Sequence, residues 1–321
     1  MQSTFIISLD FELFWGMQDC STLKKYQENV LGGREAIPEL LKQFEMHHIH
    51  ATWATVGFQF AYNYEELCEY FPADNLKPSY KDDKLSAYRC FAYIGTDEGD
   101  APCFYAPSLI KKISEYEGQE IASHTFSHYY CRETGQTIEQ FKADMKAAKK
   151  IATAHGYNLT SVVLPRNQCA REYIYALREL GFTAYRDEEN DWIHKKISFR
   201  PLRRILRLTD VYFPLTGQGG YFPRNENGIV NLAGSRMYKP FFKPLAFLEK
   251  QKIARIKKQM RYAAKNGLTF HLWWHPHNIG VMREYHMQQL EEIFTFYDKM
   301  REVYGMRSLN MREAAEEILS R

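Results

Sequence analysis

The sequence predicts an α/β fold built from parallel strands and crossover helices. Runs with strand character alternate with helix-like runs six or more times, a pattern typical of parallel sheets. Polar residues gather where the apolar strand-like runs end, and in such folds this edge of the sheet carries the active site. The chain of 321 residues, with 45% hydrophobic and 25% charged residues, is long enough for one large barrel. We therefore expect a single domain over residues 1–321.

The composition argues against several classes of protein. The formal net charge is only +3, from 42 basic and 39 acidic side chains, so bulk charge does not indicate a nucleic-acid binder. No run approaches the roughly 18 uncharged apolar residues of a membrane-spanning helix. The opening MQSTFIISLDFELFWG has neither the basic start nor the cleavage site of a signal peptide. Six scattered cysteines favour reduced thiols and a cytoplasmic location: Cys20, Cys68, Cys90, Cys103, Cys131 and Cys169.

The first half of the chain contains three predicted strands and the helices between them. Residues 4–10 (TFIISLD) are short, apolar and rich in β-branched side chains, which predicts a buried strand. Residues 34–47 carry apolar side chains at helical spacing, and residues 51–57 (ATWATVG) return to strand character. A short helix over 107–118 begins with Pro and ends with Gly, and a strand over 119–124 follows it.

The second half continues the same alternation. The clearest helical pattern runs from Thr137, expected to be its N-cap, to Gly156, expected to end it. Two segments rich in Pro, Gly and charged residues, 72–106 and 187–240, are expected to be irregular insertions. The remaining expected elements are strands at 159–165, 182–186 and 268–274, and helices at about 170–180, 243–266, 285–303 and 310–320.

His124 and His128 are the first candidates for chemistry. On a helical turn the i, i+4 spacing brings both imidazoles to one side, where they could share a metal ion. This is not the H-E-x-x-H pattern, since Thr125 stands where the glutamate base would be. Two histidines four residues apart also arise by chance among 11 in the chain.

Asp10 and Glu12 follow the first predicted strand. Residues two apart on a strand project to the same side, so the two carboxylates should lie together. Burying a carboxylate is costly unless it is paired or bound to a metal. With the two histidines they would supply ligands and a base for hydrolytic metal chemistry. The alternative is an exposed pair, or one that forms a salt bridge with a basic residue such as Arg34.

Three further segments carry candidate site residues. His275 and His277 flank Pro276 at the end of a predicted strand, and either imidazole could protonate a leaving group or pack in the core. Arg166 also follows a strand, where it could orient a carboxylate or lie on the surface. Trp192 and Trp274 could contact a sugar or belong to the core.

Taken in order, these segments resemble the polysaccharide deacetylase family (carbohydrate esterase family four). The resemblance extends over about residues 4 to 280. It implies a distorted (β/α) barrel with seven or eight parallel strands, and a divalent metal that is usually zinc. The five motifs of the family have counterparts at SLDFE (8–12), SHTFSH (123–128), LPRN (164–167), RDEENDW (186–192) and WHPHN (274–278).

The resemblance also implies roles for single residues. The first Asp of motif one, the general base of the family, corresponds to Asp10, and the two motif-two histidines correspond to the metal ligands His124 and His128. The common form of motif one is T-F-D-D-G, whereas this chain has S-L-D-F-E, so the carboxylate ligand would be Glu12 as in D-x-E members. The remaining matches give His275 as the acid, with His277 as its competitor, and Arg166 as the residue that holds Asp10; Trp192, Trp274 and His277 are expected to contact substrate.

The activity expected from this resemblance is hydrolysis of an N-acetyl rather than an O-acetyl group on a saccharide, in cell-surface polysaccharide or glycan metabolism. The zinc ion would polarise the carbonyl and bind the attacking water, Asp10 would take the proton, and His275 would protonate the amine. An alternative is a weak or inactive barrel that binds saccharide. A glycosidase that uses Asp10 and Glu12, or a non-haem iron enzyme, would leave part of this set unexplained.

Two basic stretches bear on the expected partners. Residues 195–207 (KKISFRPLRRILR) contain six basic residues among apolar ones, and residues 239–261 are similar. Such segments can rest on an anionic membrane surface or bind a phosphate-bearing, lipid-linked saccharide on its cytoplasmic side. They can equally form the solvated exterior of a barrel. No nucleic acid and no protein partner is predicted.

Overall fold

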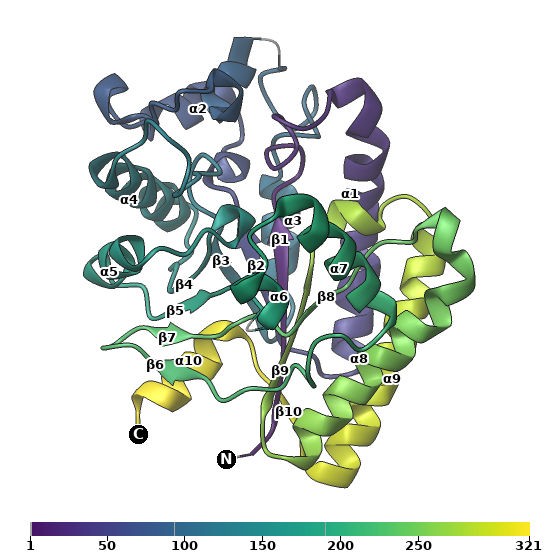
Figure 1. Cartoon of the computed structure of the whole chain (residues 1–321). Helices are drawn as coiled ribbons and strands as arrows, with labels where there is room; N and C mark the ends of the chain where they lie inside the picture. The colour runs from purple at the N-terminus through teal and green to yellow at the C-terminus, as the bar shows by residue number, and fades with distance from the viewer. Residues whose placement is uncertain (1, 93, 190) are drawn as a thin grey trace.

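A computed structural model describes residues 2–92, 94–189 and 191–321, in which one curled sheet is surrounded by helices (Figure 1). The strands are β1 Thr4–Phe11, β2 Ala51–Thr55, β3 Gln119–Ser123, β4 Ser161–Val163, β5 Ala184–Arg186, β6 Arg224–Asn225, β7 Val230–Asn231, β8 Arg236–Met237, β9 Thr269–Trp274 and β10 Arg307–Ser308. Their order is β6-β7-β5-β4-β3-β2-β1-β9-β8, with β10 paired to β1. Among the described residues, the eight strands from β7 to β8 are joined by parallel pairings, which confirms the predicted distorted barrel.

Most of the helices lie between consecutive strands and cover the outside of the sheet (Figure 1). The α-helices are α1 Leu23–Met46, α2 Tyr64–Glu69, α3 Pro107–Ser114, α4 Ile138–Ala154, α5 Arg171–Glu179, α6 Trp192–Lys196, α7 Arg200–Tyr212, α8 Glu249–Lys265, α9 Arg283–Tyr304 and α10 Met311–Leu319. The short 3-10 helices are η1 Gly57–Phe60, η2 Asp74–Leu76, η3 Asp83–Leu85, η4 Ala87–Ala92, η5 Pro165–Asn167, η6 Lys243–Leu248 and η7 Pro276–Ile279.

A single extended segment, residues 230–238, joins the two ends of the parallel series. Its first part pairs with β5, where the Leu232 amide donates to the Tyr185 carbonyl at 2.9 Å. Its second part pairs with β9, where the Ser235 amide donates to the His271 carbonyl at 2.8 Å. This one segment forms hydrogen bonds first with β5 and then with β9, and so closes the barrel. It forms fewer hydrogen bonds with each neighbour than the longer strands do.

Alternate residues of β1 belong to two different hydrophobic cores, because successive side chains of a strand face opposite sides of the sheet. Phe5, Ile7 and Leu9 belong to the large core between the sheet and the outer helices. Ile6 belongs to a smaller core that it shares with Met311 of α10 and with one or two apolar residues from each of several other strands. Beyond Ile6 the same side of the chain continues with three polar residues, Ser8, Asp10 and Glu12.

Helix α4 begins and ends where the sequence predicts. Thr137 and Gln140 form a capping box, in which the side chain of each accepts a hydrogen bond from the backbone amide of the other. Gly156 follows the C-terminus with φ of 86°, a left-handed conformation that favours glycine. Helix α1, in contrast, begins at Leu23, well before the predicted start at residue 34. Its first turns were not predicted because they are polar and lack an apolar stripe.

The two predicted insertions differ in content. The described residues of 72–106 contain only the 3-10 helices η2 to η4 as regular elements. Residues 187–240, expected to be irregular, contain α6, α7 and the strands β6 to β8. The expectation of irregular structure was wrong there for two reasons. Strands of two residues are too short to show an alternating pattern, and α7 lies among many Gly, Pro and Arg residues that are typical of loops.

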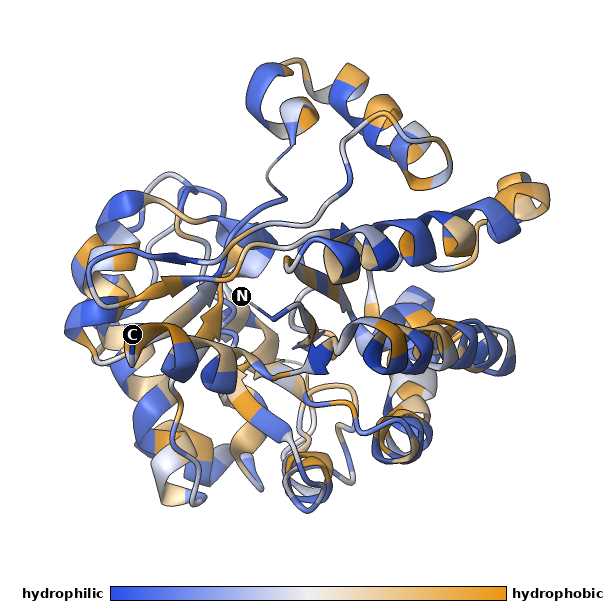
Figure 2. Cartoon of the chain, turned by 90° about the horizontal axis from the view of Figure 1, so that it is seen from below, coloured by the Kyte–Doolittle hydropathy of each residue, from blue (hydrophilic) through white to orange (hydrophobic). Residues whose placement is uncertain are grey.

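Hydropathy follows this arrangement (Figure 2). Hydrophobic residues fill the central strands, whereas the surrounding helices carry hydrophilic and hydrophobic residues in alternating bands. Within the described part of the chain, no helix combines the length and the apolar character needed to cross a bilayer.

Candidate metal centre and catalytic site

Glu12 and the two histidines of the SHTFSH segment form one buried group. The Oε2 atom of Glu12 lies 3.2 Å from Nε2 of His124 and 2.9 Å from Nε2 of His128. Ligand atoms of the three residues all lie within 4.8 Å of one another. The structure therefore brings together the three residues that the sequence predicts as metal ligands.

The other carboxylate oxygen of Glu12 faces the WHPHN segment. Its Oε1 atom lies 3.5 Å from Nε2 of His275 and 3.8 Å from Nε2 of His277. Glu12 is thus surrounded by four imidazoles. Burial alone would raise the pKa of Glu12, but the His275 charge and hydrogen bonds from His124 and His128 hold it well below its ordinary value.

Gly16 provides the space that the Glu12 carboxylate occupies. A Cβ atom at position 16 would lie 2.1 Å from both Cδ and Oε1 of Glu12. Any other residue there would push the carboxylate away from the histidines. Gly16 stands only four residues after Glu12, but no motif or spacing in the sequence indicates its role.

A tight turn after β3 presents His124 and His128. Thr125 and His128 both have positive φ, at 65° and 55°. The turn is held by Asp144 of α4, which accepts hydrogen bonds from the Phe126 amide at 2.7 Å and from the Ser127 amide at 3.2 Å and hydroxyl at 2.5 Å. Burial raises the pKa of Asp144 to about 7, against the effect of these donors.

Asp144 is a functional residue that the sequence analysis missed. The available signal was its position, since an aspartate stands beside buried Met145 within the buried face of α4. A buried aspartate at such a position needs partners. Here its partners are the backbone and a side chain of the turn that carries both histidines.

Asp10 lies beside this group and pairs with Arg186. The Oδ1 and Oδ2 atoms of Asp10 accept hydrogen bonds from Nη1 and Nη2 of Arg186, each at 2.7 Å. On its other side, Asp10 Oδ2 lies 3.5 Å from Nε2 of His275. Burial opposes ionisation, but the Arg186 guanidinium, with smaller effects from His275 and His124, lowers the pKa of Asp10 below its ordinary value.

The prediction that Arg166 holds Asp10 requires correction. Arg166 has φ of 55° in η5, and its side chain is 38% exposed; it pairs with Asp19 and lies 4.3 Å above the Tyr130 ring. The guanidinium at Asp10 belongs to Arg186, the last residue of β5, which is 1% exposed. At the end of β5 the Arg186 side chain points into the barrel, whereas the left-handed turn at Arg166 directs its side chain toward the rim.

Arg186 is itself fixed by polar contacts inside the barrel. Its Nη2 atom donates to Oδ1 of Asn167 at 2.9 Å, and Nη1 donates to the Ser8 hydroxyl at 2.9 Å. Ser8 Oγ lies 2.7 Å from Nε2 of His271, whose Nδ1 is 3.0 Å from the Leu232 carbonyl. Burial lowers the pKa of His271 to about 3, so this imidazole is neutral.

The three residues predicted to contact substrate lie in different places. Trp274 is fully buried and packs against Phe44 and Tyr238 on the outer side of β9, so the prediction of a substrate contact was wrong for this residue. Trp273, one position earlier and therefore on the opposite side, stacks on the Arg186 guanidinium at 4.2 Å. Trp192 is 40% exposed at the start of α6 and lines a separate pocket of about 290 Å³.

His277 is buried between Glu12 and α1 rather than open to a saccharide, which corrects its predicted contact. Burial, with a smaller effect from His275, lowers the pKa of His277 to about 3. Close packing of α1 sets its position, because a Cβ atom at Gly33 would lie 2.7 Å from the His277 Cα atom. His275 has a more exposed side chain, 19% against 4% for His277, and remains the histidine that could reach a substrate.

The donor set fits a divalent cation such as zinc. Two imidazole nitrogens and one carboxylate oxygen form the ligand set of many catalytic zinc sites, which leave a position open. The glycine at position 16 keeps the carboxylate against both imidazoles, as such a site requires.

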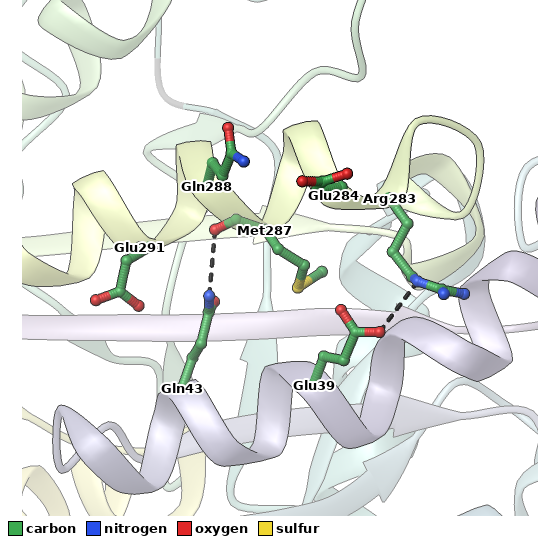
Figure 3. Close-up of a pocket in the computed structure, with 7 residues that line it drawn as sticks. All are labelled: Glu39, Gln43, Arg283, Glu284, Met287, Gln288 and Glu291. Carbon is green, nitrogen blue, oxygen red and sulfur yellow. Dashed lines mark hydrogen bonds and ion pairs between the residues drawn. The ribbon is translucent and has the colours of Figure 1, made fainter.

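A further pocket lies away from these residues, between α1 and α9 (Figure 3). It encloses about 450 Å³ and is lined mainly by charged and amide side chains. Nε of Arg283 lies 3.1 Å from Glu39 Oε1, and Gln43 donates to the Met287 carbonyl at 3.2 Å. The residues that line it include no metal ligand or catalytic residue predicted from the sequence.

Comparison with sequence families gives one match. Residues 29–185 match the family model described as polysaccharide deacetylase. This range contains His124 and His128, whereas Asp10, Glu12 and His275 lie outside it. Among curated proteins, none matches the chain significantly.

Solved structures share the fold. The chain is similar to a structure from Mycobacterium smegmatis assigned as a polysaccharide deacetylase, with a TM-score of 0.61 and 12% identity over 100% of this chain and 92% of the other. A structure from Pseudomonas aeruginosa with the same assignment gives 0.55 and 13% over 97% and 88%. A 4-alpha-glucanotransferase from Thermococcus litoralis gives 0.55 and 13% over 99% and 40%. At such identities the likeness establishes the fold alone.

Proposed function

We propose that the chain, which matches the polysaccharide deacetylase family model over residues 29–185, is a metal-dependent hydrolase that removes an N-acetyl group from a saccharide. One observation carries the proposal. Two histidines contact Glu12 from one side, and a carboxylate–imidazole pair, Asp10 with His275, lies on the other. Within one buried site the chain thus has a metal ligand set, a base and an acid.

Glu12, His124 and His128 are the residues that would hold the cation. When bound, the cation supplies a Lewis acid that polarises the acyl carbonyl and lowers the pKa of water. Asp10, kept ionised by Arg186, accepts a proton from the attacking water. Arg186 also fixes the orientation of the base, because it binds both carboxylate oxygens.

His275 then donates a proton to the leaving amine. Its Nε2 atom lies 3.5 Å from both Asp10 Oδ2 and Glu12 Oε1, so the imidazole stands between the proposed base and a proposed metal ligand. An amide nitrogen leaves only when protonated, whereas an ester oxygen leaves more readily. A positioned acid therefore favours the N-acetyl over the O-acetyl substrate, and general acid catalysis typically contributes about 10²–10⁴ in rate.

We place the substrate among saccharides of cell-surface glycan metabolism, including saccharides carried on a membrane lipid at the cytoplasmic face. The basic, apolar segment 195–207 supports the second part, because lipids of that face are often anionic. The other basic stretch, 239–261, gives less support, since Lys252 and Arg255 are buried and paired with Glu249 and Asp210.

The test combines metal analysis with acetate release from a panel of N-acetylated saccharides. The wild-type protein should retain zinc and release acetate. Asp10→Asn should keep the metal and lose acetate release, whereas His124→Ala should lose both. His155→Ala serves as the matched control, because this histidine pairs with Glu66 away from the site and should retain both properties.

Other outcomes would favour other functions. Saccharide binding without metal or acetate release would support an inactive binding barrel. New reducing ends instead of acetate would support a glycosidase that uses Asp10 and Glu12. Undiminished acetate release by Asp10→Asn would show that another group is the base.

A further inference from the structure

Helix α7 exposes a stripe of large apolar side chains. Leu202, Ile205 and Leu208 are spaced three apart, so consecutive turns place them on one side of the helix. Their exposed fractions are 43%, 63% and 44%, and Phe199 before the helix and Phe213 after it are also exposed. Exposed apolar residues in such a contiguous group, unlike scattered ones, indicate an interaction surface.

The other side of α7 is basic. By their positions around the helix, Arg203, Arg204 and Arg207 lie outside the apolar stripe; Arg204 is exposed, and Arg203 and Arg207 are half-exposed. The whole segment Trp192–Thr209 contains six basic residues and no acidic one. A helix with a strongly amphipathic pattern, low overall hydrophobicity and arginines on its polar face has the character of an interfacial membrane helix.

The C-terminus of α7 is anchored to the barrel. Asp210, its first acidic residue, is buried and accepts hydrogen bonds from Arg236 of β8 and Arg255 of α8, each at 2.7 Å. It also accepts from the Thr216 amide at 2.7 Å and the Thr216 hydroxyl at 2.8 Å. The only carboxylate of α7 is therefore paired with arginines inside the protein, and the exposed part of the helix keeps its positive charge. These contacts also fix the position of the helix on the barrel.

We propose that α7, with Phe199 and Phe213 at its ends, is a docking surface for an anionic lipid bilayer. The apolar stripe enters the boundary between headgroups and acyl chains, and the arginines meet the lipid phosphates. Charge complementarity favours an anionic partner, and the apolar stripe favours a bilayer over a nucleic acid, since a nucleic-acid surface offers no apolar layer for Ile205 and its neighbours. This inference deepens the proposed function, because it brings a lipid-linked saccharide to the same membrane surface.

The test is co-flotation of the full chain with vesicles, without added metal or substrate, so that its result is independent of deacetylation. Vesicles of phosphatidylcholine with phosphatidylglycerol should bind the protein, and vesicles of phosphatidylcholine alone should bind it much more weakly. Ile205→Glu should lower binding at least about tenfold. The double change Arg203→Gln with Arg204→Gln should lower it by roughly fivefold for each charge removed.

Matched controls separate docking from general surface chemistry. Val303→Glu makes the same kind of change at a residue of α9 that is 66% exposed, and Lys111→Gln with Lys112→Gln removes two exposed charges from α3. Both controls should bind vesicles as the wild type does. Equal binding to neutral and anionic vesicles, or equal losses in the controls, would overturn the proposal. So would a dimer that Ile205→Glu dissociates, without vesicle binding, because the stripe would then bind a second copy.

Discussion

Both carboxylate oxygens of Asp10 accept hydrogen bonds from the two terminal nitrogens of Arg186, each at 2.7 Å. The pair is buried inside the barrel, where a bidentate contact fixes both the charge and the direction of the carboxylate. Arg186 is held in turn by Asn167, Ser8 and the ring of Trp273. The orientation of the proposed base is thus set by a residue that does not itself reach the metal ligands.

Replacing Arg186 should affect catalysis more than metal binding. In Arg186→Gln the carboxylate of Asp10 loses its fixed direction, and we expect kcat/KM for acetate release to fall by about 10²–10⁴ while zinc content stays near normal. The free energy of unfolding should also fall by about 3–5 kcal/mol, because the buried charge of Asp10 loses its partner. Acetate release, elemental analysis and thermal unfolding measure the three quantities.

Two variants make this prediction specific. Arg186→Lys keeps the charge without the planar fork, so it should fold better than Arg186→Gln yet remain impaired. Arg166→Gln, at the rim beside Asp19, should lose much less activity. If Arg166→Gln were the more damaging change, the assignment of Arg186 as the positioning residue would be wrong.

Gly16→Ala should weaken metal binding without unfolding the protein. The added methyl group would lie 2.1 Å from Cδ of Glu12, and the end of that flexible side chain is what can move. We expect the zinc dissociation constant to rise by about 10–100-fold, as for other changes that misorient ligands. Competition with a chelator measures the affinity. Gly217→Ala, where a Cβ atom meets no neighbour within 4 Å, is the control and should bind zinc normally.

The alternation of strands and helices could be predicted because long periodic segments reveal it. TFIISLD, ATWATVG and LTFHLWW carry the apolar runs that became β1, β2 and β9. The proximity of Glu12, His124 and His128 followed from one further rule, that the carboxyl ends of parallel strands share an edge. In these cases local pattern and topology suffice.

The details that depend on packing could not be predicted. Whether Arg166 or Arg186 reaches Asp10 depends on a left-handed turn in η5, which no periodicity reveals. Trp273 and Trp274 differ only by strand register, which decides which ring faces the barrel interior. Asp144 and Gly16 act through tertiary contacts with the turn and with Glu12.

Substrates with different leaving groups should distinguish the roles of His275 and His277. His275→Gln should lose about 10²–10⁴ in the hydrolysis of an N-acetyl amide, but far less with an aryl acetate, whose leaving group needs no protonation. His277→Gln should affect both substrates alike, because the buried His277 contacts Glu12. The ratio of the two rates in each variant is the measurement. Equal ratios in both variants would remove the acid role from His275.

Asp144 should make folding stability depend on pH in an unusual direction. Its pKa is raised in the folded protein to about 7 from 3.8, so between these values the native state holds a proton that the unfolded state has released. The free energy of unfolding should therefore fall as pH rises through this window, by roughly 1.4 kcal/mol for each pH unit at most. Asn at position 144 cannot titrate, so the free energy of unfolding of Asp144→Asn should fall less steeply over the same pH range. It should also be lower by a constant amount at every pH, because the contacts of the introduced amide to Ser127 are weaker. Denaturant unfolding at several pH values measures both slopes, with the exposed Asp83→Asn as control. Parallel curves for wild type and Asp144→Asn would mean that Asp144 is ionised throughout, and that the turn carrying His124 and His128 is held by a charged carboxylate.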